Sequence, residues 1–160
     1  MKGLIVIGYQ GIGKSSCGGK NNCIDLESSC FWVGDKRADD WYIPYCTMAI
    51  HLASQGYTVF TSSHRVVYTY FASLCLPPEI GKVVVFCPDS RYKNEWVERL
   101  QERFDRTGLH KDYKALMNAK ERYVDSIQEL VNCGLPVYQP AYIDYDLMNY
   151  ITKMRHDWCE

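Results

Sequence analysis

The stretch GLIVIGYQGIGKSS, residues 3–16, decides the fold of this chain. Residues 8–15 fit the pattern G-x-x-x-x-G-K-[ST] at every fixed position, and an apolar run, residues 4–7, stands directly before them. The glycines let the backbone curl with its N–H groups pointing inwards, and a following helix adds its positive end. This context predicts a phosphate-binding loop between a buried strand and a helix. The alternative is a glycine-rich turn with a solvated lysine.

The pattern also assigns chemistry to single residues of the loop. Lys14 is expected to reach the terminal phosphates, and Ser15 to place its hydroxyl on a magnesium ion that bridges them. Ser16 is a further phosphate donor at the first turn of the helix. The predicted phosphate-binding residues are Gly8, Gly11, Ile12, Gly13, Lys14, Ser15 and Ser16.

Length and charge limit the classes of protein to consider. The chain has 160 residues, 47% of them hydrophobic, which suffices for one domain (1–160) with a buried core. Its formal net charge of −1 excludes the global basic field on which non-specific nucleic-acid binders rely. We therefore expect that the partner is a small molecule and that the chain binds no nucleic acid.

Cysteine spacing and hydropathy indicate a compartment. The eight cysteines show no C-x-x-C spacing, which argues against a zinc site and a disulfide scaffold. The apolar runs are too short for a signal peptide or a membrane span. We expect a reduced, cytoplasmic protein with no membrane partner, whose cysteines are mostly small core residues.

Apolar runs alternate with helical patterns along the chain, which predicts a three-layer α/β/α fold around a five-stranded parallel sheet. A short first helix should end at Gly18-Gly19. On the next helix, Trp41, Tyr45, Met48 and Leu52 recur on one face, and Tyr113 and Val124 belong to the apolar stripe of the longest helix. The expected strands are 4–7, 23–26, 57–61, 83–87 and 135–139, and the other helices are 41–54, one ending near residue 74, 92–106, 111–131 and 146–154.

Ligands of open parallel sheets collect at the carboxyl ends of the strands, and several polar residues follow the expected strands. Asp25 and Glu27 end the second strand, where carboxylates two residues apart point the same way and could hold magnesium or orient a substrate hydroxyl. A solvated acid pair is the alternative. Arg65, after the third strand, could grip an acceptor phosphate with two parallel hydrogen bonds.

Two arginines and several aromatic residues are further candidates. Arg99 and Arg103 lie one helical turn apart, where like charges repel unless a polyphosphate is bound. Ion pairs with glutamates of the same helix are the alternative. Trp32 and Tyr42 could stack on a nucleobase, although aromatic residues at helical spacing usually belong to a core.

These motifs resemble those of the P-loop nucleoside and nucleotide kinases, the group that includes adenylate, thymidylate and shikimate kinases. Residues 83–89, VVVFCPD, and residues 99–103, RLQER, are similar to the family's fourth strand and to the R-L-x-x-R start of its lid. Ile143 and Asp144, with the helix after them, resemble the closing segment that flanks the adenine. By overall style the chain resembles small nucleotide kinases of phages and bacteria.

The resemblance implies a P-loop kinase that uses magnesium and moves the terminal phosphoryl group of ATP to a small acceptor, most often a nucleoside monophosphate. Lys14, Arg99 and Arg103 would stabilise the transferring phosphate, and Ser15 and Asp25 would hold the metal. Residues 89–110 would include a small lid. The enzyme would be a monomer or homodimer in the cytoplasm, that of the host if a phage encodes it. The acceptor would be bound by Glu27, Arg65, Trp32 and Tyr42.

One departure from the family keeps two alternatives open. Adenylate kinases end strand three with D-G-F-P-R, whereas residues 61–65 here read TSSHR, so Asp25 would have to replace the missing acid. A nucleoside or shikimate-type kinase, whose acceptor is a hydroxyl, would need Asp25 or Glu27 as its base. The other alternative is an interaction protein that binds ATP without transferring phosphate.

Overall fold

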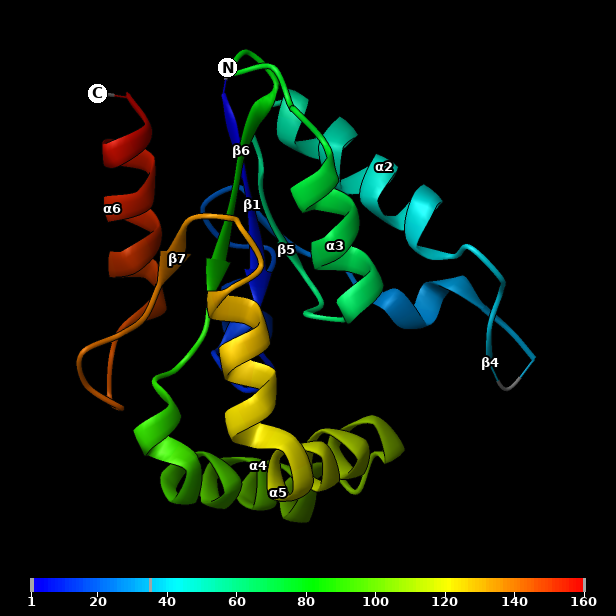
Figure 1. Cartoon of the computed structure of the whole chain (residues 1–160), viewed down its shortest axis with the longest axis vertical. Helices are drawn as coiled ribbons and strands as arrows, with labels where there is room; N and C mark the ends of the chain where they lie inside the picture. The colour runs from blue at the N-terminus through cyan, green and yellow to red at the C-terminus, as the bar shows by residue number, and fades with distance from the viewer. Residues whose placement is uncertain (1, 35, 160) are drawn as a thin grey trace.

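The centre of the molecule is a five-stranded parallel sheet. A computed structural model describes residues 2–34 and 36–159, and its main sheet has the strand order β2-β5-β1-β6-β7 (Figure 1). The α/β class and the five parallel strands are therefore confirmed. The strands are β1 (Gly3–Gly8), β2 (Cys23–Asp25), β5 (Thr58–Thr61), β6 (Gly81–Phe86) and β7 (Val137–Tyr138).

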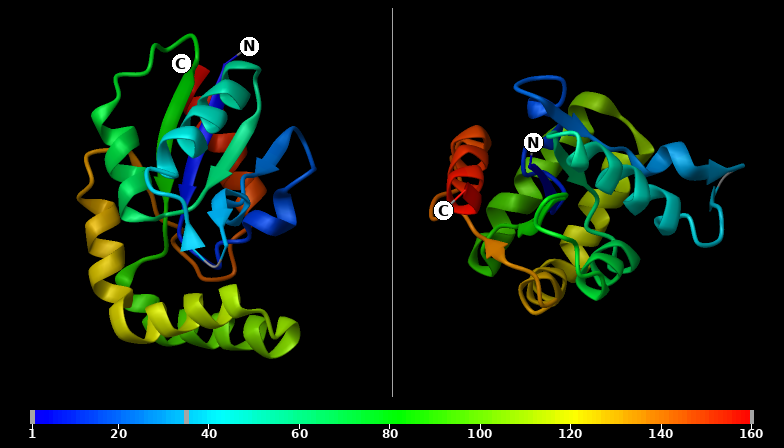
Figure 2. Two further views of the ribbon diagram at one scale, coloured as in Figure 1. Left: turned by 90° about the vertical axis from the view of Figure 1, so that its right-hand side faces the viewer. Right: turned by 90° about the horizontal axis from the view of Figure 1, so that it is seen from above.

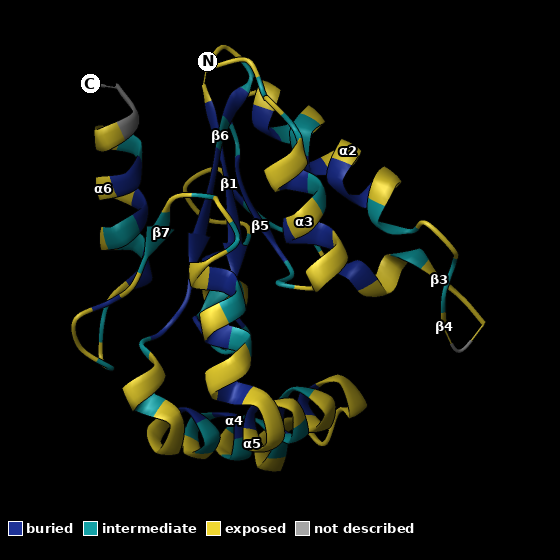
Figure 3. Ribbon diagram, viewed as in Figure 1, coloured by how far each residue is buried: buried dark blue, intermediate teal, exposed yellow. Residues whose placement is uncertain are grey.

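The middle strands are apolar on both faces because both faces are covered. Every residue of β1 is buried, and Ile5 pairs with Val59 of β5 on one side and with Val83 of β6 on the other. Figure 3 shows these strands as the buried centre, with the outer surfaces of the surrounding helices exposed.

Helix α2 (Tyr42–Ser54) packs on one face of the sheet, next to α3 (Arg65–Ser73). The backbone of Ala53 in α2 lies so close to Gly3 of β1 that a Cβ atom at residue 3 would collide with it. This close approach explains why a glycine begins the strand.

Helix α6 (Leu147–Cys159) covers the opposite face (Figure 2). Arg155 donates a 2.9 Å hydrogen bond from Nε to Oγ1 of Thr58. Thr58 pairs with Leu4, the residue after Gly3, and successive side chains of a strand point to opposite faces of the sheet. Because Gly3 faces α2, the contact between Arg155 and Thr58 lies on the other face. Helices thus lie on both faces of the sheet.

Two helices form a hairpin beyond the carboxyl ends of the strands (Figure 1). They are α4 (Lys93–Thr107) and α5 (His110–Val131), and Gly108 between them adopts a left-handed φ of 62°. The backbone of α5 departs from helical geometry at Arg122, with φ −134° and ψ 19°. A kink therefore separates the hairpin half of α5 from the half that returns to the sheet.

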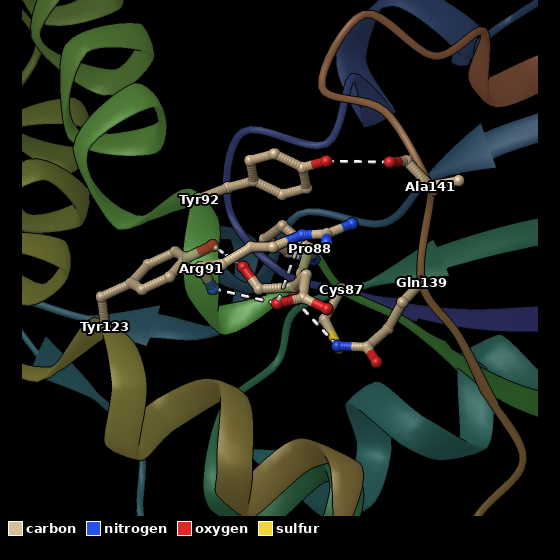
Figure 4. A network of polar contacts seen from close by, with 8 residues as sticks. Cys87, Pro88, Arg91, Tyr92, Tyr123, Gln139 and Ala141 are labelled. Atoms are coloured by element: carbon tan, nitrogen blue, oxygen red, sulfur yellow. Dashed lines mark hydrogen bonds and ion pairs between the residues drawn. The ribbon is translucent and has the colours of Figure 1, made fainter.

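Hydrogen bonds fix the point where the chain leaves the sheet and enters this hairpin (Figure 4). The Tyr123 hydroxyl donates to the carbonyl oxygen of Asp89 at 2.7 Å, just beyond the kink in α5. The Tyr92 hydroxyl donates to the carbonyl oxygen of Ala141 at 2.8 Å. The base of the hairpin is thereby tied both to α5 and to the segment after β7.

Some elements differ from the expected ones. The sequence did not predict the antiparallel pair β3 (Trp32–Val33) and β4 (Lys36–Arg37). Met48, Tyr113 and Val124 were assigned to buried faces but are 44–47% exposed. Helix α2 instead buries Tyr45, Cys46, Ala49 and Ala53. The remaining elements are α1 (Lys14–Cys17) and two 3-10 turns, η1 (Ser28–Phe31) and η2 (Ser90–Tyr92).

The burial of the cysteines agrees in part with the expectation that most of them are small core residues. Cys17, Cys23, Cys46 and Cys87 are buried free thiols, whereas Cys30 and Cys75 are exposed and Cys133 is half-buried. Across the described ranges, no helix has the length and apolar character that crossing a membrane requires.

Candidate functional site

A cleft of about 750 Å³ opens between the carboxyl ends of the strands and the α4–α5 hairpin. The connection after β1 runs towards β2, and the connection after β6 runs towards β7 on the other side. Such a change of direction marks the ligand crevice of open α/β sheets. The predicted residues that line this cleft are Gly11, Lys14, Ser15, Asp25, Glu27, Trp32, Arg65 and Arg103.

The glycine-rich loop, residues 8–15, forms one wall of the cleft. Gly11 and Gly13 have φ values of 88° and 106°, in the left-handed region that favours glycine. Lys14 folds back over the loop, and its Nζ donates to the carbonyl oxygens of Gly8 at 3.0 Å and Thr61 at 3.4 Å. The lysine thus connects the ends of two neighbouring strands.

The acid pair lies across from this lysine. Burial raises the pKa of Asp25, and the positive charge of Lys14 opposes that shift. Burial likewise lowers the pKa of Lys14, opposed by the charges of Asp25 and Glu27. The partly dehydrated cleft therefore disfavours each charge alone, and the opposite charges stabilise one another.

The cleft is positively charged although the whole chain is not. Seven lysines and arginines line it against four aspartates and glutamates, a difference of +3 in a chain of net charge −1. This local field favours an anionic ligand. The cations are Lys14, Arg37, Arg65, Arg103, Lys111, Lys114 and Arg122, and the anions are Asp25, Glu27, Asp112 and Glu129.

Helix α5 supplies the opposite wall and holds Arg103 in place. Nε of Arg103 lies 2.9 Å from Oδ1 of Asp112, whose side chain is 5% exposed. The hydroxyl of Thr107 also donates to Asp112. Lys111 reaches across the cleft to within 3.7 Å of Glu27. The hairpin thus contacts Glu27, one member of the acid pair.

Other predicted residues lie outside the cleft lining. Nη1 of Arg99 donates to the carbonyl oxygen of Gly11 at 3.1 Å, and Nη2 donates to that of Ile143 at 2.7 Å. Tyr42 packs edge-on against Tyr70, between α2 and α3. Gly8, Ile12, Gly13 and Ser16 belong to the loop or to its first helical turn without lining the cleft. In the part of the chain that the structure describes, neither Arg99 nor Arg103 pairs with a glutamate of α4.

Sequence reasoning missed the inward face of α5. Lys111, Lys114, Asn118 and Arg122 all line the cleft, and they recur every three or four residues. Residues at this spacing share one side of a helix, so a polar stripe beside the apolar one was the available signal.

Tyr45, which was expected on the apolar face of its helix, also connects two cleft loops. Its hydroxyl donates to the carbonyl oxygen of Leu26 at 2.7 Å and accepts from the N–H of Ser62 at 2.9 Å. The segment after β2 is thereby tied to the segment after β5. A buried tyrosine at helical spacing carries no sequence signal for such a role.

Comparison with known proteins adds no family. No protein-family model matches this sequence, and a search of curated proteins finds no similar chain.

Proposed function

We propose that this chain is a P-loop kinase that transfers the terminal phosphoryl group of ATP to a small acceptor, most favourably a nucleoside monophosphate. One observation carries the proposal: the glycine-rich loop shares a single cleft with Lys14, Asp25, Arg65 and Arg103. Phosphoryl transfer needs little covalent help from a protein and much positioned positive charge. This cleft offers that charge.

Lys14 and Arg103 are the residues that stabilise the transferring phosphate. In the described ranges the Lys14 ammonium donates to two neutral carbonyls and to no carboxylate, so its charge is available to ATP. Arg103 is oriented by the buried Asp112. In the structure described above, Arg99 could act on the phosphates directly only if its guanidinium left both of its carbonyl partners.

The residues of the cleft fit a magnesium ion of the kind that nucleotide enzymes use. Among the described residues no group of three or more histidines, cysteines, aspartates and glutamates could hold a metal. Magnesium that accompanies a nucleotide needs no such cage, because substrate phosphates, waters and one or two protein oxygens surround it. The Ser15 hydroxyl and the Asp25 carboxylate, both at the cleft, are the proposed protein ligands. The ion would neutralise charge on the phosphates.

The acceptor side is formed by Arg65, Glu27 and Trp32 in this proposal. The excess of cations favours an acceptor that is itself a phosphate, whose oxygen is already ionised and needs no base. With a hydroxyl acceptor, Asp25 or Glu27 would have to remove the proton. A nucleoside or small-molecule kinase is therefore the second candidate, and the acid pair is the observation that favours it.

The test is ADP release from magnesium-ATP with a panel of nucleoside monophosphates, nucleosides and small hydroxy acids. Wild-type turnover of about 1–100 per second with one class would name the acceptor. Lys14→Ala should lower that rate by at least about 100-fold, because one positioned donor to the transferring charge is lost. Lys120→Ala is the matched control, since Lys120 is exposed on α5 and does not line the cleft.

Two outcomes contradict the proposal in different ways. Equal rates for Lys14→Ala and wild type would remove the loop from the reaction. If the wild type binds ATP but turns over no acceptor, the chain is an ATP-binding module rather than a kinase.

A further inference from the structure

Three consecutive carbonyl oxygens of the glycine-rich loop are each held by a side chain from outside the loop. Nε1 of Trp96 donates to Gln10 at 2.8 Å, and Nη1 of Arg99 donates to Gly11 at 3.1 Å. The hydroxyl of Tyr145 donates to Ile12 at 2.7 Å. The donors come from α4 and from the segment that precedes α6, so distant parts of the chain converge on one turn.

These contacts set the direction of the loop's N–H groups. In a trans peptide the C=O and the following N–H lie in one plane and point in opposite directions. Carbonyls directed at the three side chains therefore turn the N–H groups of the next residues away from those side chains. Within the described part of the chain, the N–H groups of Gly11 and Gly13 donate to no protein acceptor. Free N–H groups that converge in a turn bind anions.

The three donors also hold one another in place. The rings of Trp96 and Tyr145 are parallel within 4°, with centroids 6.5 Å apart, and the Arg99 guanidinium lies 4.2 Å from the Trp96 ring centroid. The other terminal nitrogen of Arg99, Nη2, donates to the carbonyl oxygen of Ile143. Trp96 is fully buried. Side chains confined in this way keep the peptide planes from rotating.

We propose that Trp96, Arg99 and Tyr145 are positioning residues that keep the glycine-rich loop in the conformation that binds a phosphate chain. This inference rests on the proposed function and deepens it. It attributes the phosphate-binding conformation of the loop to contacts on the side of the loop that faces away from the ligand. It also gives Arg99 a different role from the direct phosphate contact expected from sequence. The ligand class is a polyphosphate, with or without a base.

The experiment measures dissociation constants of the magnesium complexes of ATP and of inorganic tripolyphosphate by calorimetry. The variants are Tyr145→Phe, which removes one hydroxyl, and Arg99→Lys, which keeps the charge but cannot reach both carbonyls. Tyr150→Phe is the control, because its hydroxyl belongs to the same aromatic cluster but accepts from Ala141 instead of contacting the loop. Melting temperatures are recorded in parallel.

We expect both variants to bind ATP and tripolyphosphate about tenfold more weakly than the wild type, because losing a hydrogen bond of ordinary strength leaves a peptide plane free to rotate. The KM for the acceptor should change less than the dissociation constant for ATP. The control should bind both ligands as the wild type does. A loss of stability without a loss of phosphate affinity is what a merely structural role would give, and it would overturn the inference.

The remaining outcomes separate this inference from the function on which it rests. Weaker binding of ATP with unchanged binding of tripolyphosphate would mean that Tyr145 or Arg99 contacts the base. That result would overturn the proposed positioning role. A lower kcat with unchanged affinity for both ligands would indicate that Arg99 acts directly on the transferring phosphate. That result would also overturn the inference. If the wild type binds neither phosphate ligand, the proposed function and the inference fail together.

Discussion

At the scale of single residues, Asp25 should decide how magnesium-ATP binding responds to pH. Burial raises the pKa of this carboxyl, so it stays protonated at a higher pH than an ordinary aspartate with a pKa of about 3.9. A protonated carboxyl cannot serve as the proposed metal ligand. Affinity should therefore be greatest above the folded-state pKa of Asp25 and fall as the pH drops through it.

The measurement compares wild type with Asp25→Asn between about pH 8 and pH 4, so that the range reaches the pKa of an ordinary aspartate, and the terminal phosphate of ATP also titrates within it, near pH 6. Taking the ratio of the two dissociation constants cancels the titration of ATP. We expect the advantage of the wild type to shrink towards low pH. A ratio that stays constant across the range would remove Asp25 from metal binding.

Tyr45 provides a second prediction at this scale, concerning stability. Tyr45→Phe leaves the carbonyl of Leu26 and the N–H of Ser62 without their buried partner, which should lower the free energy of unfolding by about 1–3 kcal/mol. Urea denaturation measures the loss. Tyr42→Phe is the control, since Tyr42 is half-buried on the same helix and should change stability by less than about 0.5 kcal/mol. Equal losses in the two variants would show that Tyr45 acts only through its ring.

At the scale of elements, hydrophobic period was enough to place the long segments. Residues 4–7 of β1 and 83–86 of β6 are apolar and mostly β-branched, and α4 buries Trp96 and Leu100 four residues apart. The two-residue strands β3 and β4 have no period to detect, because they exist only through pairing with each other. β7 is likewise limited to the two residues that pair with β6.

The α4–α5 hairpin gives the prediction at this scale. Asp112 is buried and binds both Arg103 and Thr107, so Asp112→Asn should lower the free energy of unfolding by about 1.5–3 kcal/mol, the range for hydrogen bonds to charged groups. It should also slow phosphoryl transfer, because Arg103 loses its orientation. Asp105→Asn, an exposed change on α4, is the control for both measurements. Unfolding curves that coincide for the two variants would contradict the prediction.

At the scale of the whole molecule, the rule that ligands gather at the carboxyl ends of strands grouped Lys14, Asp25 and Arg65 from sequence, and all three line one cleft. Sequence did not indicate the strand order or that α5 folds over these ends. Both depend on how crossovers pack in three dimensions. Arg99 shows the limit most clearly: its spacing from Arg103 suggested a shared role, yet their guanidinium groups bind different partners.

The arrangement of the hairpin predicts a change when both substrates bind. On the acceptor side it is held by Lys111 and Glu27, whose side chains are 53% and 47% exposed, and ion pairs of that kind contribute no more than about 1 kcal/mol. On the other side, the kink at Arg122 and the tie between Tyr123 and Asp89 mark its base. Filling the cleft with phosphates and an acceptor would add contacts to Arg103 and to the inward face of α5, so the hairpin should open less often.

Amide hydrogen exchange tests this lid prediction in residues 89–110 and in the half of α5 before its kink. Exchange there should slow when magnesium-ATP and the acceptor are both present, while α2 and β5 change little because their buried contacts lie outside the cleft mouth. Lys14→Ala with the same ligands is the control, since it should bind ATP too weakly to close the hairpin. Equal exchange in the free and the doubly liganded wild type would mean that the hairpin is a fixed wall, and Arg103 would then have to meet the phosphate from the position set by Asp112.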